Sequence, residues 1–173
     1  DEASAFRLTQ LAAEHVGPTY LRLSRIENPT LLSPLSLQWG QAIRLKEGTM
    51  GTLVGSGMLL DRTLALAYEL QEKLGWDLEV LTFPFVKPLD TEAIDWLAQR
   101  KKGVMVIEEH QRAGGVGSAL AEVLVERGPV PMKLCGVEDT FGESGEAHEL
   151  LDKYGFSAAQ LYEKAQTFFT PLL

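Results

Sequence analysis

The sequence predicts an α/β fold: a three-layer, open and mostly parallel sheet with one antiparallel edge strand and helices on both faces. Short apolar runs of strand length alternate along the chain with longer segments of helical periodicity. Glycine-containing turns join several of these runs to the helical segment that follows. The run at 104–107 is apolar at every position, which is typical of a parallel strand buried on both faces.

The segment at 103–127, which reads GVMVIEEHQRAGGVGSALAEVLVER, is the clearest strand-turn-helix unit. The strand predicted at 104–107 is expected to end at Glu108, because the charged residues that begin there should not continue a buried strand. Glycines at 114, 115 and 117 then allow a tight turn. From Val116 onward, apolar residues recur at the i, i+3, i+4, i+7 and i+8 spacing of one helical face.

The elements before this unit alternate in the same way. Strand-like runs at 42–46 and 52–57 flank a glycine-containing stretch, which suits a β-hairpin whose first strand is the antiparallel edge. A helix is expected after the second run. Its predicted inner face consists of Leu60, Leu64, Ala67, Leu70 and Leu74.

The other elements follow the same alternation. They are a strand at 78–83, a helix capped by Asp90 or Thr91, a strand at 131–137, and two helices that start at Ser144 and Ser157. Ser157 is followed three residues later by Gln160, which has the form of a capping box.

The N-terminal part of the chain is less regular. A short helical pattern ends at Gly17, and an alternating stretch at 19–24 predicts a strand. A proline-interrupted linker follows at 26–39. A lone helix and strand cannot bury a sheet face, so we expect the regular domain to begin near Gly40.

Composition and charge limit the classes of function. The chain of 173 residues has a net charge of −8 and no basic run, so we expect neither nucleic acid nor membrane as a partner. No apolar stretch has the length of a membrane span and no signal-peptide pattern is present, which predicts a cytoplasmic protein. Cys135 is the only cysteine, and its apolar neighbours predict an inert buried thiol.

Two short motifs could carry chemistry. Gly55-Ser56-Gly57 lies between a strand and a helix and could hold a phosphate, but it lacks the third glycine of a dinucleotide-binding fingerprint, so close packing is favoured. The segment at 108–110, Glu-Glu-His, could supply metal ligands or an acid/base group. Consecutive residues at a strand end point in different directions, so a loop or subunit-contact role is favoured.

Two arginines close the strand predicted at 19–24. In open α/β sheets, ligands bind at the carboxyl ends of strands, and a guanidinium group there suits a phosphate or a carboxylate. Arg25 lies at the very end and is preferred over Arg22. An equally weighted alternative is a salt-bridged arginine at a domain junction.

Several segments together resemble the C-terminal section of transketolases, including those split into two polypeptides. They are GPTYLRLSR at 17–25, GTLVGSG at 51–57, FVKPLD at 85–90, EEHQRAGGVGSALAEVL at 108–124, FGESG at 141–145 and ELLDKYGFSAAQL at 149–161. The resemblance covers essentially the whole chain in the right order. Deoxyxylulose-phosphate synthases and beta subunits of 2-oxo-acid dehydrogenases share KPLD-like and GG-x-GS-like segments, but FGESG followed by ELL and YG favours transketolase.

The resemblance implies how the chain divides into domains and which functional motifs of the family it does not contain. Residues 1–35 would be the tail of a pyrimidine-binding domain with its linker, and 40–173 the transketolase C-terminal domain. The family binds thiamine diphosphate and magnesium through motifs that lie upstream and have no match here. We therefore expect no catalytic, cofactor-binding or metal-binding residue in the chain. The exception is Arg25, because Ser24-Arg25 matches the LSR-Q-N segment that contains the family's substrate-phosphate arginine, although Gln-Asn is replaced by Ile26-Glu27.

The resemblance also implies an activity for the parent enzyme: transfer of a two-carbon ketol unit between sugar phosphates, as in the pentose phosphate pathway. This portion would serve structural, dimer-contact and phosphate-anchoring roles. A homodimer or a heteromeric partner would supply the missing diphosphate- and pyrimidine-binding domains, so the chain alone is expected to be inactive. The alternatives are another thiamine-diphosphate enzyme, namely a deoxyxylulose-phosphate synthase or a 2-oxo-acid dehydrogenase beta subunit, and a non-catalytic effector-binding or interaction module.

Overall fold

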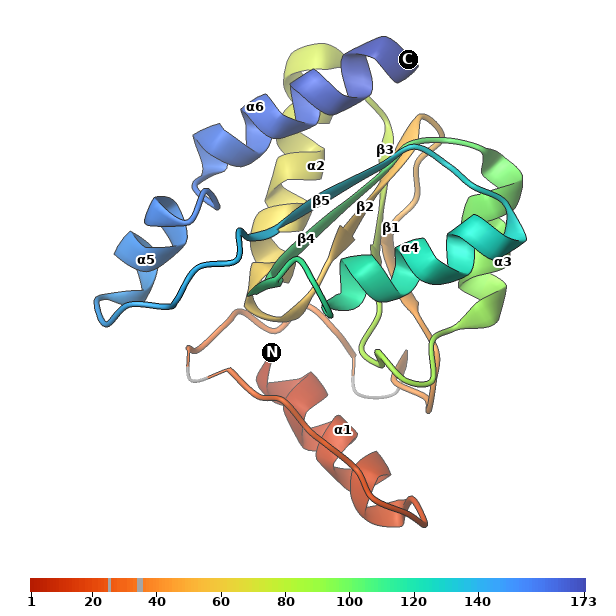
Figure 1. The fold of residues 1–173 in the computed structure, drawn as a ribbon, viewed down its shortest axis with the longest axis vertical. Helices are drawn as coiled ribbons and strands as arrows, with labels where there is room; N and C mark the ends of the chain where they lie inside the picture. Colours follow the sequence, from red (N-terminus) through yellow and green to blue (C-terminus); the bar gives the residue numbers. More distant parts are fainter. Residues whose placement is uncertain (25, 34–35) are drawn as a thin grey trace.

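A computed structural model describes residues 1–24, 26–33 and 36–173 (Figure 1). Its centre is a five-stranded sheet in the order β1-β3-β2-β4-β5. The strands are β1 Ile43–Lys46, β2 Gly51–Gly55, β3 Leu78–Thr82, β4 Val104–Gln111 and β5 Met132–Val137. Neighbouring strands are parallel except β1, which runs antiparallel to β3 at one edge. The predicted fold class is confirmed, including its antiparallel edge strand.

Helices cover both faces of this sheet. The helices of the described residues are α1 Glu2–Glu14, α2 Leu60–Leu74, α3 Thr91–Arg100, α4 Val116–Arg127, α5 Ala147–Lys153 and α6 Ala158–Phe169, with 3-10 turns η2 Gly57–Leu59 and η3 Thr170–Leu172. Figure 1 shows α2 and α6 on one side of the sheet and α3 and α4 on the other. The first helix, α1, lies apart from these layers, beneath the sheet in that view.

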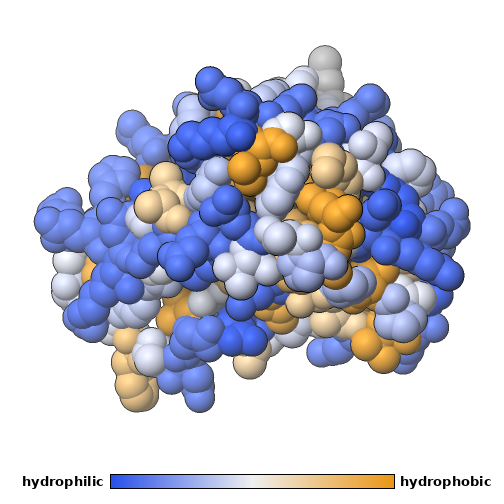
Figure 2. All heavy atoms as spheres, turned by 90° about the horizontal axis from the view of Figure 1, so that it is seen from above, coloured by the Kyte–Doolittle hydropathy of each residue, from blue (hydrophilic) through white to orange (hydrophobic). Residues whose placement is uncertain are grey.

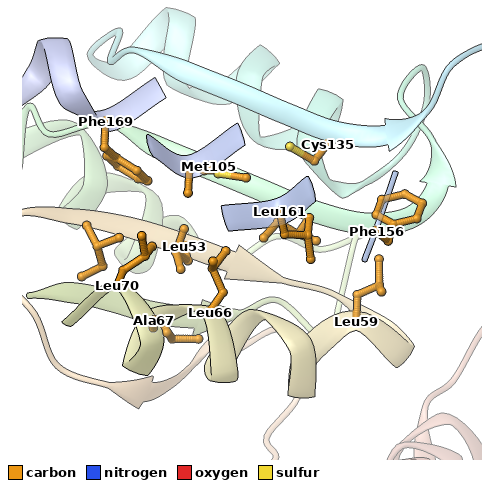
Figure 3. Close-up of a cluster of buried hydrophobic side chains, with 14 of the residues drawn as sticks. Leu53, Leu59, Leu66, Ala67, Leu70, Met105, Cys135, Phe156, Leu161 and Phe169 are labelled. Carbon is orange, nitrogen blue, oxygen red and sulfur yellow. The ribbon is translucent and has the colours of Figure 1, made fainter. Parts of the chain in front are cut away.

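Strand periodicity decides which core each residue joins, because successive side chains of a strand point to opposite faces. On β4, Met105 and Ile107 pack with α2 and α6, whose contributions include Leu66 and Phe169 (Figure 3). The intervening residues of β4, Val104 and Val106, join the second core under α3 and α4. The chain therefore has a separate apolar core on each face of the sheet, as expected for a central strand that is apolar at every position from 104 to 107.

The predicted hairpin at 42–57 is wrong: β1 pairs with β3 and makes no ladder with β2. The segment that connects β1 to β2 instead passes next to the start of β3. There the N–H groups of Thr49 and Met50 both donate to the backbone oxygen of Asp77 at 2.9 Å. Lys46 donates to the Asp77 carboxylate at 3.2 Å. This charged residue of the edge strand therefore has its ion-pair partner next to the start of β3.

The strand predicted at 19–24 is also wrong, because these residues form an irregular connection. The two leucines that would form one face of this strand are not buried: Leu21 is only partly covered and Leu23 is 56% exposed. Alternation predicted a half-buried strand, but the described residues of this segment pair with none of the five strands of the sheet.

Two element boundaries differ from expectation. The charged residues after Ile107 continue β4 to Gln111. Polar partners are available at this end of the strand: the Glu108 carboxylate accepts from the Val116 N–H, and the Arg112 N–H donates to the Val137 oxygen. Helix α5 begins at Ala147 with Glu146 as its N-cap, later than the predicted start at Ser144. The predicted caps at Asp90 and Ser157 are confirmed, and the latter is a full capping box.

The inner face of α2 is rotated relative to the prediction. Leu74 is exposed, whereas Thr63 and Leu66 are buried. Thr63 can be buried because its hydroxyl donates to the Leu59 backbone oxygen at 2.7 Å.

The thiol of Cys135 is buried, as the sequence predicted. Cys135 is 4% exposed, and burial raises the pKa of its thiol, so it is held in the neutral, unreactive form. Figure 2 shows a face on which hydrophilic residues predominate and apolar ones form small separate groups. None of the helices in the described part of the chain is both long and apolar enough to cross a membrane.

Candidate functional site

Residues from three separate segments meet at the carboxyl ends of β2 and β4. The two strands lie side by side in parallel register, with Gly55 opposite Ile107. The backbone directly after β2 remains hydrogen-bonded to β4, since the Ser56 N–H donates to the Ile107 oxygen at 3.0 Å. Glu108 and Glu109 follow Ile107 directly. This end of an α/β sheet is where such folds ordinarily place ligands.

Glu108 caps helix α4. Its carboxylate accepts hydrogen bonds from the backbone N–H groups of Val116 at 2.7 Å and Gly117 at 2.9 Å, and the residue is 3% exposed. A Cβ at Gly115 would collide with this carboxylate, which explains a glycine there. The positive end of the helix dipole is therefore occupied by an internal anion, in the place where an anionic ligand would otherwise bind.

Glu109 points to the opposite face of β4, against Gly57. A Cβ at Gly57 would lie 2.8 Å from a Glu109 carboxylate oxygen, and the glycine has a φ of 56°. A Cβ at Gly55 would likewise lie 2.8 Å from the Thr63 hydroxyl oxygen. These close approaches support the packing interpretation of Gly55-Ser56-Gly57 over a phosphate-binding one.

Arg22 reaches this position from the N-terminal segment. Its Nη1 forms an ion pair with the Glu109 carboxylate, and its Nη2 donates to the Glu109 backbone oxygen at 3.3 Å. The arginine side chain is 51% exposed and the glutamate side chain 13%. For Arg22, the structure thus supports the salt-bridge alternative rather than ligand binding.

Arg25 lies outside the described residues, so its predicted role in binding a substrate phosphate stays a prediction. The described residues on either side of it are joined directly. The Ser24 hydroxyl oxygen accepts a hydrogen bond from the Ile26 N–H at 3.0 Å, which is the pattern of a serine turn.

The acidic residues and His110 do not form a metal site. His110 Nδ1 lies 2.7 Å from the Gln111 backbone oxygen, and the two glutamates face opposite sides of the sheet. Among residues 1–24, 26–33 and 36–173, no group of three His, Cys, Asp or Glu side chains could hold a metal ion. The contacts of Glu108 and Glu109 are within the chain, which favours a structural role for this segment.

A buried carboxylate at Glu79 was missed by the sequence interpretation. Glu79 is 1% exposed, and its carboxylate accepts hydrogen bonds from Thr52 at 2.8 Å and Trp96 at 3.2 Å. It also pairs with Arg44 at 2.7 Å and with Arg100 at 2.8 Å. These contacts tie β1, β2 and α3 to β3. The available signal was a lone charge within the apolar run at 78–83.

Comparison with known proteins identifies the fold and its family. The family model for the transketolase C-terminal domain matches residues 40–161. The chain belongs to the transketolase C-terminal domain family. Family relatives include a 6-deoxy-6-sulfo-D-fructose transketolase subunit of Clostridium sp. (strain MSTE9), which is 37% identical over 87% of this chain and 47% of its own length.

Two other relatives show the breadth of the family. An apulose-4-phosphate transketolase subunit of Phocaeicola vulgatus is 29% identical over 97% of this chain and 54% of its own length. A 1-deoxy-D-xylulose-5-phosphate synthase of Desulforudis audaxviator is 32% identical over 96% of this chain and 27% of its own length. This transketolase C-terminal chain spans about half the length of the curated relatives it matches, or less.

Solved transketolase structures show the same arrangement. A split-gene transketolase, described as an inactive beta4 tetramer, matches the whole of this chain with a TM-score of 0.91 and 36% identity, over 57% of its own length. The transketolase of Campylobacter jejuni matches 74% of this chain with a TM-score of 0.53 and 28% identity, over 18% of its own length. The first likeness includes the N-terminal segment as well as the family domain.

Proposed function

We propose that this chain is the C-terminal section of a thiamine-diphosphate-dependent transketolase that transfers a two-carbon ketol unit between sugar phosphates. The observation that carries the proposal is the likeness of the entire chain, at 36% identity and a TM-score of 0.91, to a split-gene transketolase. Two relatives are also named as transketolase subunits. The division into a pyrimidine-binding-domain tail at 1–35 and a C-terminal domain at 40–173 is part of this proposal.

The chain's own contribution would be binding and support. Thiamine diphosphate with magnesium would supply the nucleophilic carbanion from a site formed by other domains. The sheet and its two cores would hold the N-terminal segment rigidly through Arg22 and Glu109. Arg25, on that segment, would bind the substrate phosphate, since a guanidinium group can donate two parallel hydrogen bonds to phosphate oxygens. Such an anchor orients the sugar at a distance from the reacting carbonyl.

A partner chain would complete the enzyme. Relatives named as subunits, and a split-gene neighbour described as inactive when it is a beta4 tetramer, support a heteromeric partner that carries the diphosphate-binding domain. By the same argument, we expect this chain to be inactive by itself.

Arg25→Ala tests the anchoring role. In the full-length, assembled enzyme, we expect KM for phosphorylated sugars to rise roughly 10- to 100-fold. This is the effect expected from losing hydrogen bonds between the protein and a charged phosphate. Neither KM nor kcat for the same sugars without phosphate should change. Steady-state kinetics with both substrate forms measures this difference, and an equal KM for the phosphorylated sugar in both enzymes would contradict the assignment.

A second candidate is 1-deoxy-D-xylulose-5-phosphate synthase activity. It is favoured by a relative with that name, 32% identical over 96% of this chain. An assay for the formation of 1-deoxy-D-xylulose 5-phosphate separates the two activities. An effector-binding module is less well supported, because the Glu108 carboxylate already occupies the N-terminus of α4 at the strand ends.

A further inference from the structure

An exposed aromatic side chain lies on the loop between β5 and α5. This β5–α5 loop, residues 138–146, reads EDTFGESGE and extends away from the sheet before the chain turns into α5 (Figure 1). Phe141, near its middle, is 98% exposed, although phenylalanine is among the residues that proteins most often bury. One exposed apolar side chain is ordinary on a protein surface. What distinguishes Phe141 is how its loop is held.

The backbone around Phe141 is fixed from two sides. The Gln111 side-chain amide, at the end of β4, donates to the Thr140 oxygen at 2.8 Å. The Tyr154 hydroxyl, at the end of α5, donates to the Phe141 oxygen at 3.2 Å. Two successive carbonyl groups are thus held by different elements. A loop that is ordered before binding loses less conformational entropy on binding, so Phe141 is presented as a preformed anchor.

The residue after Phe141 is a glycine that the packing of the described residues does not explain. Gly142 lies outside the left-handed region of φ that favours glycine. No described atom lies within 4 Å of a Cβ placed there. At such a position alanine is more stable than glycine, because it lowers the conformational entropy of the unfolded chain. Close approach of another molecule to this backbone would account for the glycine.

The charge of the β5–α5 loop indicates the chemistry of that molecule. The loop contains acidic residues and no basic one. Glu138 and Glu143 form exposed ion pairs with basic residues that flank the loop. Asp139 and Glu146 are exposed and have no ion-pair partner among the described residues. Two copies of this loop would repel one another, whereas an apolar pocket surrounded by lysine or arginine would attract it.

The loop begins at the end of the sheet to which the N-terminal segment is attached. β2, β4 and β5 are parallel, so the chain leaves β5 at the same edge as Glu109, the ion-pair partner of Arg22. In the proposed function the N-terminal segment is part of the pyrimidine-binding domain. In that arrangement, this end of the C-terminal domain faces the rest of the enzyme, and the β5–α5 loop lies on that side.

We propose that the β5–α5 loop docks onto the partner chain, with Phe141 inserted into an apolar pocket that is surrounded by basic residues of the partner. This inference rests on the proposed function, in which a separate chain carries the diphosphate-binding domain. Buried aromatic anchors carry much of the binding free energy at protein interfaces. Complementary charges around them mainly accelerate association and select the partner.

The test measures the affinity of the full-length protein for the purified chain that carries the diphosphate-binding domain, by isothermal titration calorimetry. Phe141→Ala should raise Kd roughly 30-fold, the loss typical of an interface anchor. Gly142→Ala should raise Kd roughly 10-fold through overpacking at the interface, while Tm stays the same or increases. The matched control is Val125→Ala on α4, also an exposed apolar residue, which should change neither Kd nor Tm.

A charge variant tests the basic surroundings of the pocket. Asp139 has a φ of 32°, a conformation that asparagine also adopts, so Asp139→Asn removes the charge and keeps the shape. Kd at low salt should rise about threefold through slower association. The difference should vanish at about 1 M salt, where the Debye length is about 3 Å. An equal Kd for both proteins at low salt would contradict a basic partner surface.

The outcomes separate this inference from the proposed function. If the unsubstituted protein binds the partner chain and Phe141→Ala binds it equally well, the inference is overturned and the proposed function stands. Weaker self-association of the Phe141→Ala variant, with unchanged affinity for the partner chain, would assign the loop to a contact between copies of this chain and also overturn it. If the unsubstituted protein does not bind the partner chain, the heteromeric arrangement fails first, and the inference with it.

Discussion

Glu79→Ala is expected to lower the free energy of unfolding by about 3 kcal/mol, which corresponds to roughly 10 °C in Tm for a chain of this size. The substitution removes the common acceptor of Thr52 and Trp96 and leaves Arg100 beside a buried space without its counter-ion. Arg44 can turn to water, because its side chain is 41% exposed, so the loss stays at the lower end for a broken buried pair. Urea and thermal unfolding followed by circular dichroism measure it.

Two further variants make this result interpretable. Glu79→Gln keeps the shape and one acceptor oxygen but removes the charge, so its loss should be about half as large. Glu126→Ala replaces an exposed glutamate on α4 and should change the free energy of unfolding by less than about 0.5 kcal/mol. Equal unfolding free energies for the Glu79→Ala and Glu126→Ala variants would contradict a structural role for the buried carboxylate.

Glu108→Ala should lower the free energy of unfolding by about 2 kcal/mol and loosen the first turn of α4. The backbone N–H groups of Val116 and Gly117 lose a charged acceptor in a buried position, and the helix dipole loses its compensating charge. Hydrogen exchange at these two amides should therefore accelerate more than exchange in α2. Glu122→Ala, at an exposed position of the same helix, is the matched control. Unchanged exchange at both amides would show that Glu108 is not the cap.

The sequence was most informative where local chemistry decides the structure. The apolar run before Glu108, the capping box at Ser157 and the glycine turn before α4 predicted a strand, a helix start and a strand-turn-helix unit, and all three are confirmed. Each depends on residues that are neighbours in the chain. The resemblance of several ordered segments to transketolases then predicted the family, which the match at 40–161 confirms.

The sequence was least informative where distant partners decide the structure. The hairpin was wrong because β1 pairs with β3, and the contacts around Asp77 that guide it there are long-range. The segment at 19–24 alternates like a strand, but the sheet is complete without it. The partner of Arg22 is 87 positions away, so no spacing rule could have assigned it to Glu109.

The most direct test of the central claim is a ketol-transfer assay on the full-length protein, assembled with the chain that supplies its missing domains and supplied with thiamine diphosphate and magnesium. We expect transfer of a two-carbon unit from a ketose phosphate to an aldose phosphate, and no transfer by the 173-residue chain alone. Formation of 1-deoxy-D-xylulose 5-phosphate without ketol transfer by the assembled protein, or full activity of the isolated chain, would contradict the account.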